Sequence, residues 1–266
     1  MKVLLFLAVW VALIASPRVG AQDISAKLPS FEVATIKPVE PGAMRIVGVT
    51  VYPEDRIVIR STSLKGLICT AFNVSGWQVS GPEQMDKPLY DVEGKAPEPS
   101  QKEPFDTRHS YWTIEDERLR EMLQTLLIER FQLKFHRETK PGTVYLLQQD
   151  GKTLRLKTTK ATAGSPYSGN IGAAAGRGWT IHDTSMAQLA QHLSSYILHQ
   201  AVIDKTALDG YFDFESKTIL TNEDFRTPNF SDTLISVLPE MGLKLQKTTG
   251  PVEGFVVDHV EPPPEN

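Results

Sequence analysis

Histidines are the residues of this chain with the widest chemical range, because they can bind metals and transfer protons near neutral pH. The 266 residues include six histidines, and none belongs to an HExxH pattern or a compact group of ligands. His192 and His199 lie seven positions apart on one predicted helix face. A role near the helix C-terminus is favoured there over metal binding. His136 lies between Phe135 and Arg137 in a predicted strand. We therefore expect no metal site.

Two pairs of carboxylates are the next candidates for acid–base chemistry. Asp91 and Glu93 are separated by one residue, as are Asp213 and Glu215. Because side chains two positions apart point to the same face of a strand, each pair is expected on the solvent face of a sheet. A single active site rarely needs its parts twice, so a role in folding is favoured for both pairs.

The sequence patterns of nucleophilic and phosphate-binding enzymes are missing. The chain contains no GxSxG and no SxxK, and its Gly/Ala-rich loop at 164–178 lacks GxGxxG and GK[ST]. We therefore predict no catalytic residues and no cofactor. A secreted hydrolase with an unrecognised site is the competing hypothesis. It requires a histidine and a carboxylate from distant segments to meet, and the pairs to test are His136 or His192 with Asp204 or Asp213.

Aromatic and histidine side chains form a weaker candidate for a binding surface. Rings offer stacking area and a polar edge, although packing in the core explains most aromatic residues equally well. The six candidates for such a surface are Trp77, Tyr90, His136, Trp179, His192 and Tyr211.

The overall charge bounds the class of partner. A formal net charge of −4 provides no basic excess of the kind that nucleic-acid surfaces show, so no nucleic-acid partner is expected. Cys69 is the only cysteine, which excludes an intramolecular disulfide. It lies on the apolar side of a predicted helix, and we expect it to pack in the core.

Residues 1–21 have the pattern of a secretory signal peptide. Lys2 supplies a positive start, Val3 to Ala15 are all apolar, and small residues precede a cleavage site after Ala21. The apolar run has about 13 residues, fewer than the roughly 20 that a membrane-spanning helix needs. An uncleaved anchor is the less favoured alternative. We expect a mature chain that begins at Gln22, has no transmembrane span and is periplasmic or extracellular.

Two segments of the chain align without a gap at an offset of 122 residues. Positions 56–95 match positions 178–217, with eight identical residues. Each segment contains a β-rich run, a helix that begins after Ser63 or Ser185, and two further strands. We interpret this pattern as an internal duplication.

The order of predicted elements indicates the fold class. A helix near 115–131 precedes two strands that Pro141 and Gly142 are expected to join in a hairpin, and a helix near 230–241 precedes a second hairpin over 243–260. Each half therefore has the order β-β-α-β-β-α-β-β. This order predicts an α+β fold of mixed sheets with helices packed on one face. We place the units at 1–21 (signal peptide), 22–150 (first repeat), 151–260 (second repeat) and 261–266 (disordered tail), and leave open whether the repeats form one domain or two.

Several motifs resemble those of a known family. The segments that carry the resemblance are PSFEVATIK at 29–37, Tyr90-Asp91-Val92, Val202 to Thr206, Gly210 to Phe214 and Gly242 to Leu245. The chain is similar to the DUF3738 family, soil-associated proteins found in many paralogous copies in Acidobacteria. This resemblance implies a secreted or envelope protein without an assigned activity. Similar domains follow regulatory membrane peptidases of the antibiotic-sensor type, which suggests a sensory or binding role.

The favoured hypothesis is an exported, non-catalytic binding protein. Its partner would be an unknown envelope or extracellular protein or peptide, recognised by edge-strand addition or in a cleft between the halves. Besides the hydrolase, an envelope scaffold that acts by self-association is the third hypothesis, and a large exposed apolar patch would indicate it.

Overall fold

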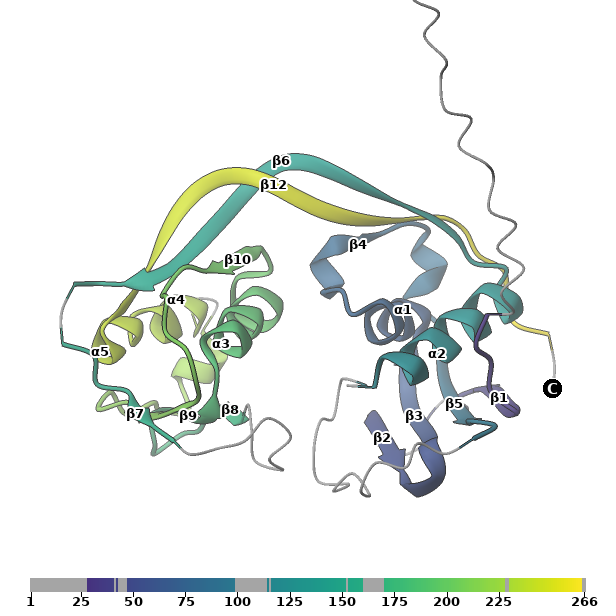
Figure 1. The fold of residues 1–266 in the computed structure, drawn as a ribbon, viewed down its shortest axis with the longest axis horizontal. Helices are drawn as coiled ribbons and strands as arrows, with labels where there is room; N and C mark the ends of the chain where they lie inside the picture. Colours follow the sequence, from purple (N-terminus) through teal and green to yellow (C-terminus); the bar gives the residue numbers. More distant parts are fainter. Residues whose placement is uncertain are drawn as a thin grey trace, which may run out of the picture.

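The computed structural model describes residues 28–40, 42, 47–98, 114, 116–151, 153–159, 170–227 and 230–264. The predicted signal peptide lies outside these residues. The described chain forms two lobes joined by a long two-stranded ribbon (Figure 1). Each lobe combines helices with sheets, so the predicted α+β class is confirmed. Within the described ranges, no helix is both long enough and apolar enough to cross a membrane.

The ribbon consists of strands β6 (Lys134–Gln149) and β12 (Leu243–His259), paired antiparallel along nearly their whole length. The two predicted hairpins are therefore wrong, because each is one continuous strand. Pro141 pairs with Pro251 and Gly142 with Gly250 at the middle of the ribbon. Proline and glycine usually indicate a turn. Here the two prolines lie opposite each other, so neither donates a backbone hydrogen bond at this position, and strand pairing continues on both sides of it.

Two short strands extend the ribbon into a four-stranded sheet of order β10-β6-β12-β4. Strand β10 (Ala201–Asp204) runs parallel to β6, and β4 (Val79–Ser80) runs parallel to β12. Each end of the ribbon therefore belongs to a different lobe.

Lobe 1 has an outer antiparallel sheet of order β1-β5-β3-β2, with α1 and α2 between this sheet and the ribbon (Figure 1). The elements are β1 (Val33–Pro38), β2 (Gly48–Tyr52), β3 (Arg56–Ser63), α1 (Leu64–Phe72), β5 (Leu89–Lys95) and α2 (Glu117–Arg130). Ile59, Leu67, Leu123 and Phe255 meet in one buried core, to which the sheet, both helices and the ribbon contribute.

Lobe 2 repeats this layering, with an outer sheet of order β7-β11-β9-β8 and helices beneath the ribbon (Figure 1). Its elements are β7 (Lys157–Thr158), β8 (Asn170–Ala173), β9 (Trp179–Thr184), α3 (Met186–His192), β11 (Phe212–Glu215), α4 (Phe230–Ile235) and α5 (Leu238–Met241). Ile181, Leu189, Phe214 and Leu147 belong to its core.

Short turns connect these elements. Helix α3 continues as a wider π-type turn over Leu193–Leu198, and the helix predicted near 230–241 is divided into α4 and α5. The 3₁₀ turns lie at Pro53–Asp55, Gly76–Gln78, Glu83–Met85 and Asp224–Arg226.

The predicted helix caps are confirmed. Ser63 Oγ accepts a hydrogen bond from the N–H of Gly66 at 3.2 Å, and Ser185 Oγ accepts one from Gln188 at 3.2 Å. A serine before the first helical residue satisfies a backbone donor that has no partner inside the helix.

The two outer sheets have the same strand register at the offset of 122. Thr62 pairs with Tyr90 in lobe 1, and Thr184 pairs with Phe212 in lobe 2. The pairing shifts before both positions, so the irregularity recurs as well. An internal duplication is in line with this register and stays a prediction.

The ribbon carries side chains from each half of the sequence into the opposite lobe. Phe255 of β12 stacks on Phe135 at 4.5 Å and contacts Phe72 at 4.7 Å, deep in lobe 1. Leu147 of β6 is buried in the core of lobe 2. The lobes in space therefore share strands across position 150.

This exchange predicts which lobe a change in β12 destabilises. Phe255 is 1% exposed, so Phe255→Ala should lower the free energy of unfolding by about 3–5 kcal/mol in a denaturant titration. Amide exchange should accelerate more in α1 than in α3. Phe225→Ala, which removes a 40% exposed ring, is the matched control and should cost less than about 1 kcal/mol. Faster exchange in α3 than in α1 would contradict the exchange of strands.

Candidate binding cleft

An aspartate holds the irregular position in each outer sheet. Asp91 Oδ1 accepts a hydrogen bond from the N–H of Ser61 at 2.8 Å, and Asp213 Oδ1 accepts one from the N–H of Asp183 at 2.9 Å. Ser61 and Asp183 have left-handed φ values of 48° and 45°. A residue in this conformation interrupts the strand ladder, so its N–H needs another acceptor. Asp91 and Asp213 therefore have the folding role expected of them.

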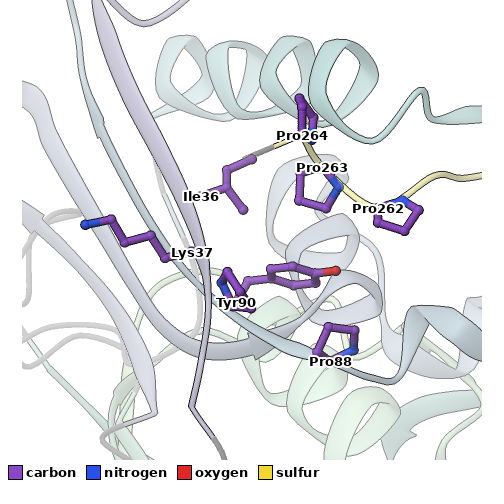
Figure 2. Close-up of a pocket in the computed structure, with 8 residues that line it drawn as sticks. Ile36, Lys37, Pro88, Tyr90, Pro262, Pro263 and Pro264 are labelled. Carbon is purple, nitrogen blue, oxygen red and sulfur yellow. The ribbon is translucent and has the colours of Figure 1, made fainter. Parts of the chain in front are cut away.

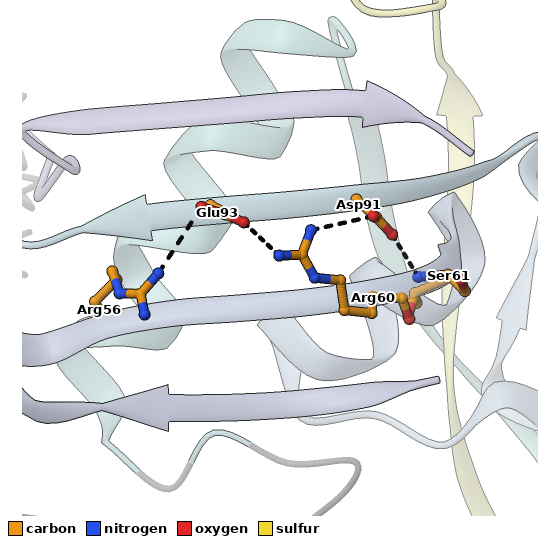
Figure 3. A network of polar contacts seen from close by, with 6 residues as sticks. Arg56, Arg60, Ser61, Asp91 and Glu93 are labelled. Carbon is orange, nitrogen blue, oxygen red and sulfur yellow. Dashed lines mark hydrogen bonds and ion pairs between the residues drawn. The ribbon is translucent and has the colours of Figure 1, made fainter. Parts of the chain in front are cut away.

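In lobe 1 an arginine forms ion pairs with the carboxylates of the outer face. Arg60 donates to Asp91 Oδ2 at 3.1 Å and to Glu93 Oε1 at 2.5 Å (Figure 3). Arg56 approaches Glu93 from the other side at 3.9 Å. A guanidinium spans two carboxylates because its donors form a planar fork. Asp91 and Glu93 are therefore paired with the two arginines.

In lobe 2 a histidine stands where lobe 1 has Arg60. His182 Nδ1 lies 2.8 Å from Asp213 Oδ1. Among the described residues, the imidazole has an ion-pair partner only in this carboxylate, and Glu215 makes no side-chain hydrogen bond or ion pair. The outer face of lobe 2 therefore keeps groups that lobe 1 has paired.

A cleft of about 480 Å³ opens on this face. Thr180 and His182 come from β9, Asp213 and Glu215 from β11, and Lys157 from β7. In the strand ladder, Lys157 lies opposite Asp213 and Thr180 lies opposite Glu215. These side chains therefore lie in neighbouring rows of one sheet face. The remaining lining residues are Arg155, Ile181, Phe214, Lys217 and Glu240.

Glu240 closes one end of the cleft. Its carboxylate accepts hydrogen bonds from the N–H of Lys217 at 2.7 Å, the N–H of Thr218 at 3.3 Å and the hydroxyl of Thr218 at 2.5 Å. Partial burial opposes ionisation, but the hydrogen bonds from Thr218 and Lys217 outweigh it and lower the pKa of Glu240. Glu240 is therefore a charged carboxylate that the chain itself satisfies.

The cleft contains groups that could bind a ligand or assist acid–base chemistry. It contains a His–carboxylate pair, but none of the described residues that line it is a serine or cysteine. A histidine base needs a nucleophile or a positioned water within hydrogen-bond reach. Across the described ranges, no three His, Cys, Asp or Glu side chains gather as a metal ion would require.

The His–carboxylate pairs proposed for a hydrolase are not formed. His136 Nδ1 lies 2.9 Å from Asp258, on the exposed surface of the ribbon. Asp204 accepts instead from the N–H and hydroxyl of Thr206, both at 2.8 Å. Asp213 pairs with His182, which was not among the candidate histidines. Only the sheet register brings these two residues together, and their spacing in the sequence contains no such signal.

The six aromatic and histidine candidates are distributed over both lobes. Tyr90 is buried against Phe131, with ring centroids 5.2 Å apart. Trp77 is half-buried, and its indole N–H has no acceptor among the described residues. His136 is exposed on the ribbon, as described above. These three belong to lobe 1 and its end of the ribbon.

In lobe 2, Trp179 and His192 are the two candidates that the structure brings together. Trp179 is 1% exposed and lies 6.3 Å from the His192 ring. Tyr196 covers the same histidine at 5.1 Å. Tyr211 is half-buried just before β11. Next to Tyr196, Ser195 Oγ lies 2.7 Å from Ser75 Oγ and joins the two lobes.

A second hollow, of about 350 Å³, lies on lobe 1 and is mainly apolar. Tyr90 and Pro88 face the C-terminal prolines Pro262 to Pro264 across it (Figure 2). The N–H of Glu261 donates to the carbonyl of Phe131 at 2.7 Å and anchors this proline segment. The proline segment therefore forms one side of this hollow.

The burial of His192 predicts a pH dependence of stability. Burial lowers the pKa of His192 to about 4, whereas a histidine in the unfolded chain has a pKa of about 6.5. The unfolded state then binds more protons below pH ~6.5, so stability should fall by about 2 kcal/mol between pH 7.5 and pH 5. Denaturant titrations at both pH values should show that His192→Phe removes most of this loss, whereas the exposed His136→Gln retains it. An unchanged loss in His192→Phe would contradict the assignment.

The comparison with known proteins identifies a family. The family described as "Protein of unknown function (DUF3738)" matches residues 65–260, more than half of the chain. No curated protein and no solved structure matches the chain. The resemblance in the motifs is thereby confirmed, and the expected origin in Acidobacteria stays a prediction. The matched residues include both strands of the ribbon and every residue of the lobe 2 cleft, and the chain belongs to the DUF3738 family of proteins of unknown function.

Proposed function

We propose that the chain is an exported, non-catalytic recognition protein whose ligand occupies the cleft on the outer face of lobe 2. Export is supported by the sequence pattern of residues 1–21. The partner would be an envelope or extracellular protein or peptide that inserts a polar group into the cleft.

The observation that carries this proposal is the difference between Arg60 and His182. Both lie at the same place in sheets of the same register, beside Asp91 and Asp213. Arg60 pairs with two carboxylates, whereas His182 pairs with one and leaves Glu215 without a partner in the described chain. A surface without a ligand gains from pairing its own charges, so an open set of charged groups in a concave site favours a binding role.

The proposed site lies on one lobe, whereas the sequence predicted edge-strand addition or a cleft between the halves. The secreted hydrolase stays an alternative, since His182 and Asp213 could act as base and orienting group. Its nucleophile would be a water molecule or the hydroxyl of Thr180, since the described lining residues include no serine or cysteine.

Exchanging the two side chains tests the site. His182→Arg should bridge Asp213 and Glu215 as Arg60 bridges its two carboxylates, and should fill the cleft. The mature chain, residues 22–266, is immobilised and exposed to envelope extract. We expect a partner that the unaltered chain retains and His182→Arg loses by about tenfold or more.

Arg60→His in lobe 1 is the matched control and should retain the partner. Thermal unfolding of each variant separates loss of binding from loss of structure. Equal retention by His182→Arg and the unaltered chain would contradict a site in lobe 2.

Export has its own test. The full chain, expressed in a bacterial host, should be recovered from the periplasm or medium with Gln22 as its first residue, as read by N-terminal sequencing. Removal of residues 2–21 should leave it in the cytoplasm, because the apolar segment recognised by the export machinery is gone. An uncleaved N-terminus on membrane-bound protein would instead support an anchor.

A further inference from the structure

We propose that the ligand of the lobe 2 cleft presents an anionic group, a carboxylate or a phosphate, with a hydrogen-bond donor beside it. This inference rests on the proposed function and specifies the chemistry that the cleft recognises. It follows from which charges in the cleft are already paired and which are free.

Two of the three carboxylates in the cleft are satisfied by the chain. Asp213 accepts from the N–H of Asp183 and pairs with His182 Nδ1. Glu240 accepts from two backbone N–H groups and the hydroxyl of Thr218. A carboxylate with several donors has little need of a further cation. Glu215 is the carboxylate that remains without a partner in the described chain.

Three cations line the same cleft without forming an ion pair with the described residues. They are Arg155, Lys157 and Lys217. Lys217 lies close enough to Glu240 to favour its ionised form. The free groups of the cleft are therefore predominantly positive, in a chain whose net charge is −4.

The arrangement of these groups defines the shape of the ligand. Lys157 lies opposite Asp213, one row away from the pair formed by Thr180 and Glu215. Arg155 lies two positions before Lys157, outside β7, and lines the same cleft. A ligand whose anionic group contacts Arg155 and Lys157 can offer a hydroxyl or ammonium donor to Glu215. Arginine favours carboxylates and phosphates because its planar fork matches two of their oxygens.

Lobe 1 supplies the internal comparison. Lys37 lies opposite Asp91 as Lys157 lies opposite Asp213. There, however, Arg56 and Arg60 are both paired with Glu93. The arginines beside the lobe 1 carboxylates are therefore ion-paired, whereas Arg155, Lys157 and Lys217 form no ion pair with the described residues in lobe 2.

The test is a titration of the ¹⁵N-labelled mature chain, residues 22–266, followed by amide chemical shifts at low salt. The probes are inorganic phosphate, O-phospho-L-serine and L-malate, with ethanolamine as a probe that has no anionic group. We expect saturable shifts confined to residues 155–157, 180–182 and 213–217 for the anions, and none for ethanolamine. Inorganic phosphate and L-malate each carry one class of anion, so tighter binding of one than of the other distinguishes a phosphate source from a carboxylate source, and binding of both should weaken as salt increases.

Variants make the test specific. Arg155→Gln combined with Lys157→Gln should weaken anion binding by about tenfold or more, whereas Lys37→Gln should leave it unchanged. Glu215→Gln should weaken phosphoserine and malate more than inorganic phosphate, because only the first two carry the adjacent donor. Shifts that do not saturate, that spread over both lobes, or that Lys37→Gln reduces equally would indicate an adventitious ion only and overturn the inference.

The outcome separates this inference from the function on which it rests. If His182→Arg abolishes retention of an envelope partner while no anion binds, the recognition site stands and the ligand class is wrong. If the anions bind at the predicted residues and no partner is retained, the ligand class stands and the partner proposal is wrong.

Discussion

The antiparallel pairing of β6 with β12 is the constraint on which the rest of the structure depends. Neither lobe has a complete core without it, since Phe255 fills lobe 1 from the second half of the chain and Leu147 fills lobe 2 from the first. The ladder lacks the N–H donors of Pro141 and Pro251 at its middle, and apolar contacts at its two ends add to the strand pairing on both sides of them. Stability of the two lobes should therefore be coupled, although each has its own outer sheet.

The two outer sheets have the same backbone irregularity but differ in the side chains around it. Both contain a residue in the left-handed conformation whose N–H is satisfied by an aspartate. That requirement accounts for Asp91 and Asp213 without any reference to activity. The side chain beside each aspartate then differs, and the difference between a guanidinium and an imidazole decides whether the neighbouring glutamate is paired. A change in charge pairing at this position therefore needs no change in the fold.

Local patterns in the sequence predicted the elements that depend on nearby residues. Ser63 and Ser185 indicated the starts of α1 and α3, and the spacing of Asp91 with Glu93 indicated a shared strand face. The hairpins at Pro141 and near 243–260 were wrong, because the choice between folding back and pairing with a distant strand depends on contacts a hundred residues away. The cleft was missed for the same reason, since His182 and Asp213 meet only through sheet register.

The sequence by itself determined the α+β class, the helix caps and the family, because capping, alternation and motif order are properties of neighbouring residues. Only the tertiary structure decided which strands the lobes share and which charges are paired. Those outcomes depend on the register between segments far apart in the chain, where a shift of one residue would turn His182 and Glu215 to the opposite face. The candidate site is one of the features that only the tertiary structure decided. Its residue types are ordinary, and it is distinguished by charged side chains that have no ion-pair partner among the described residues.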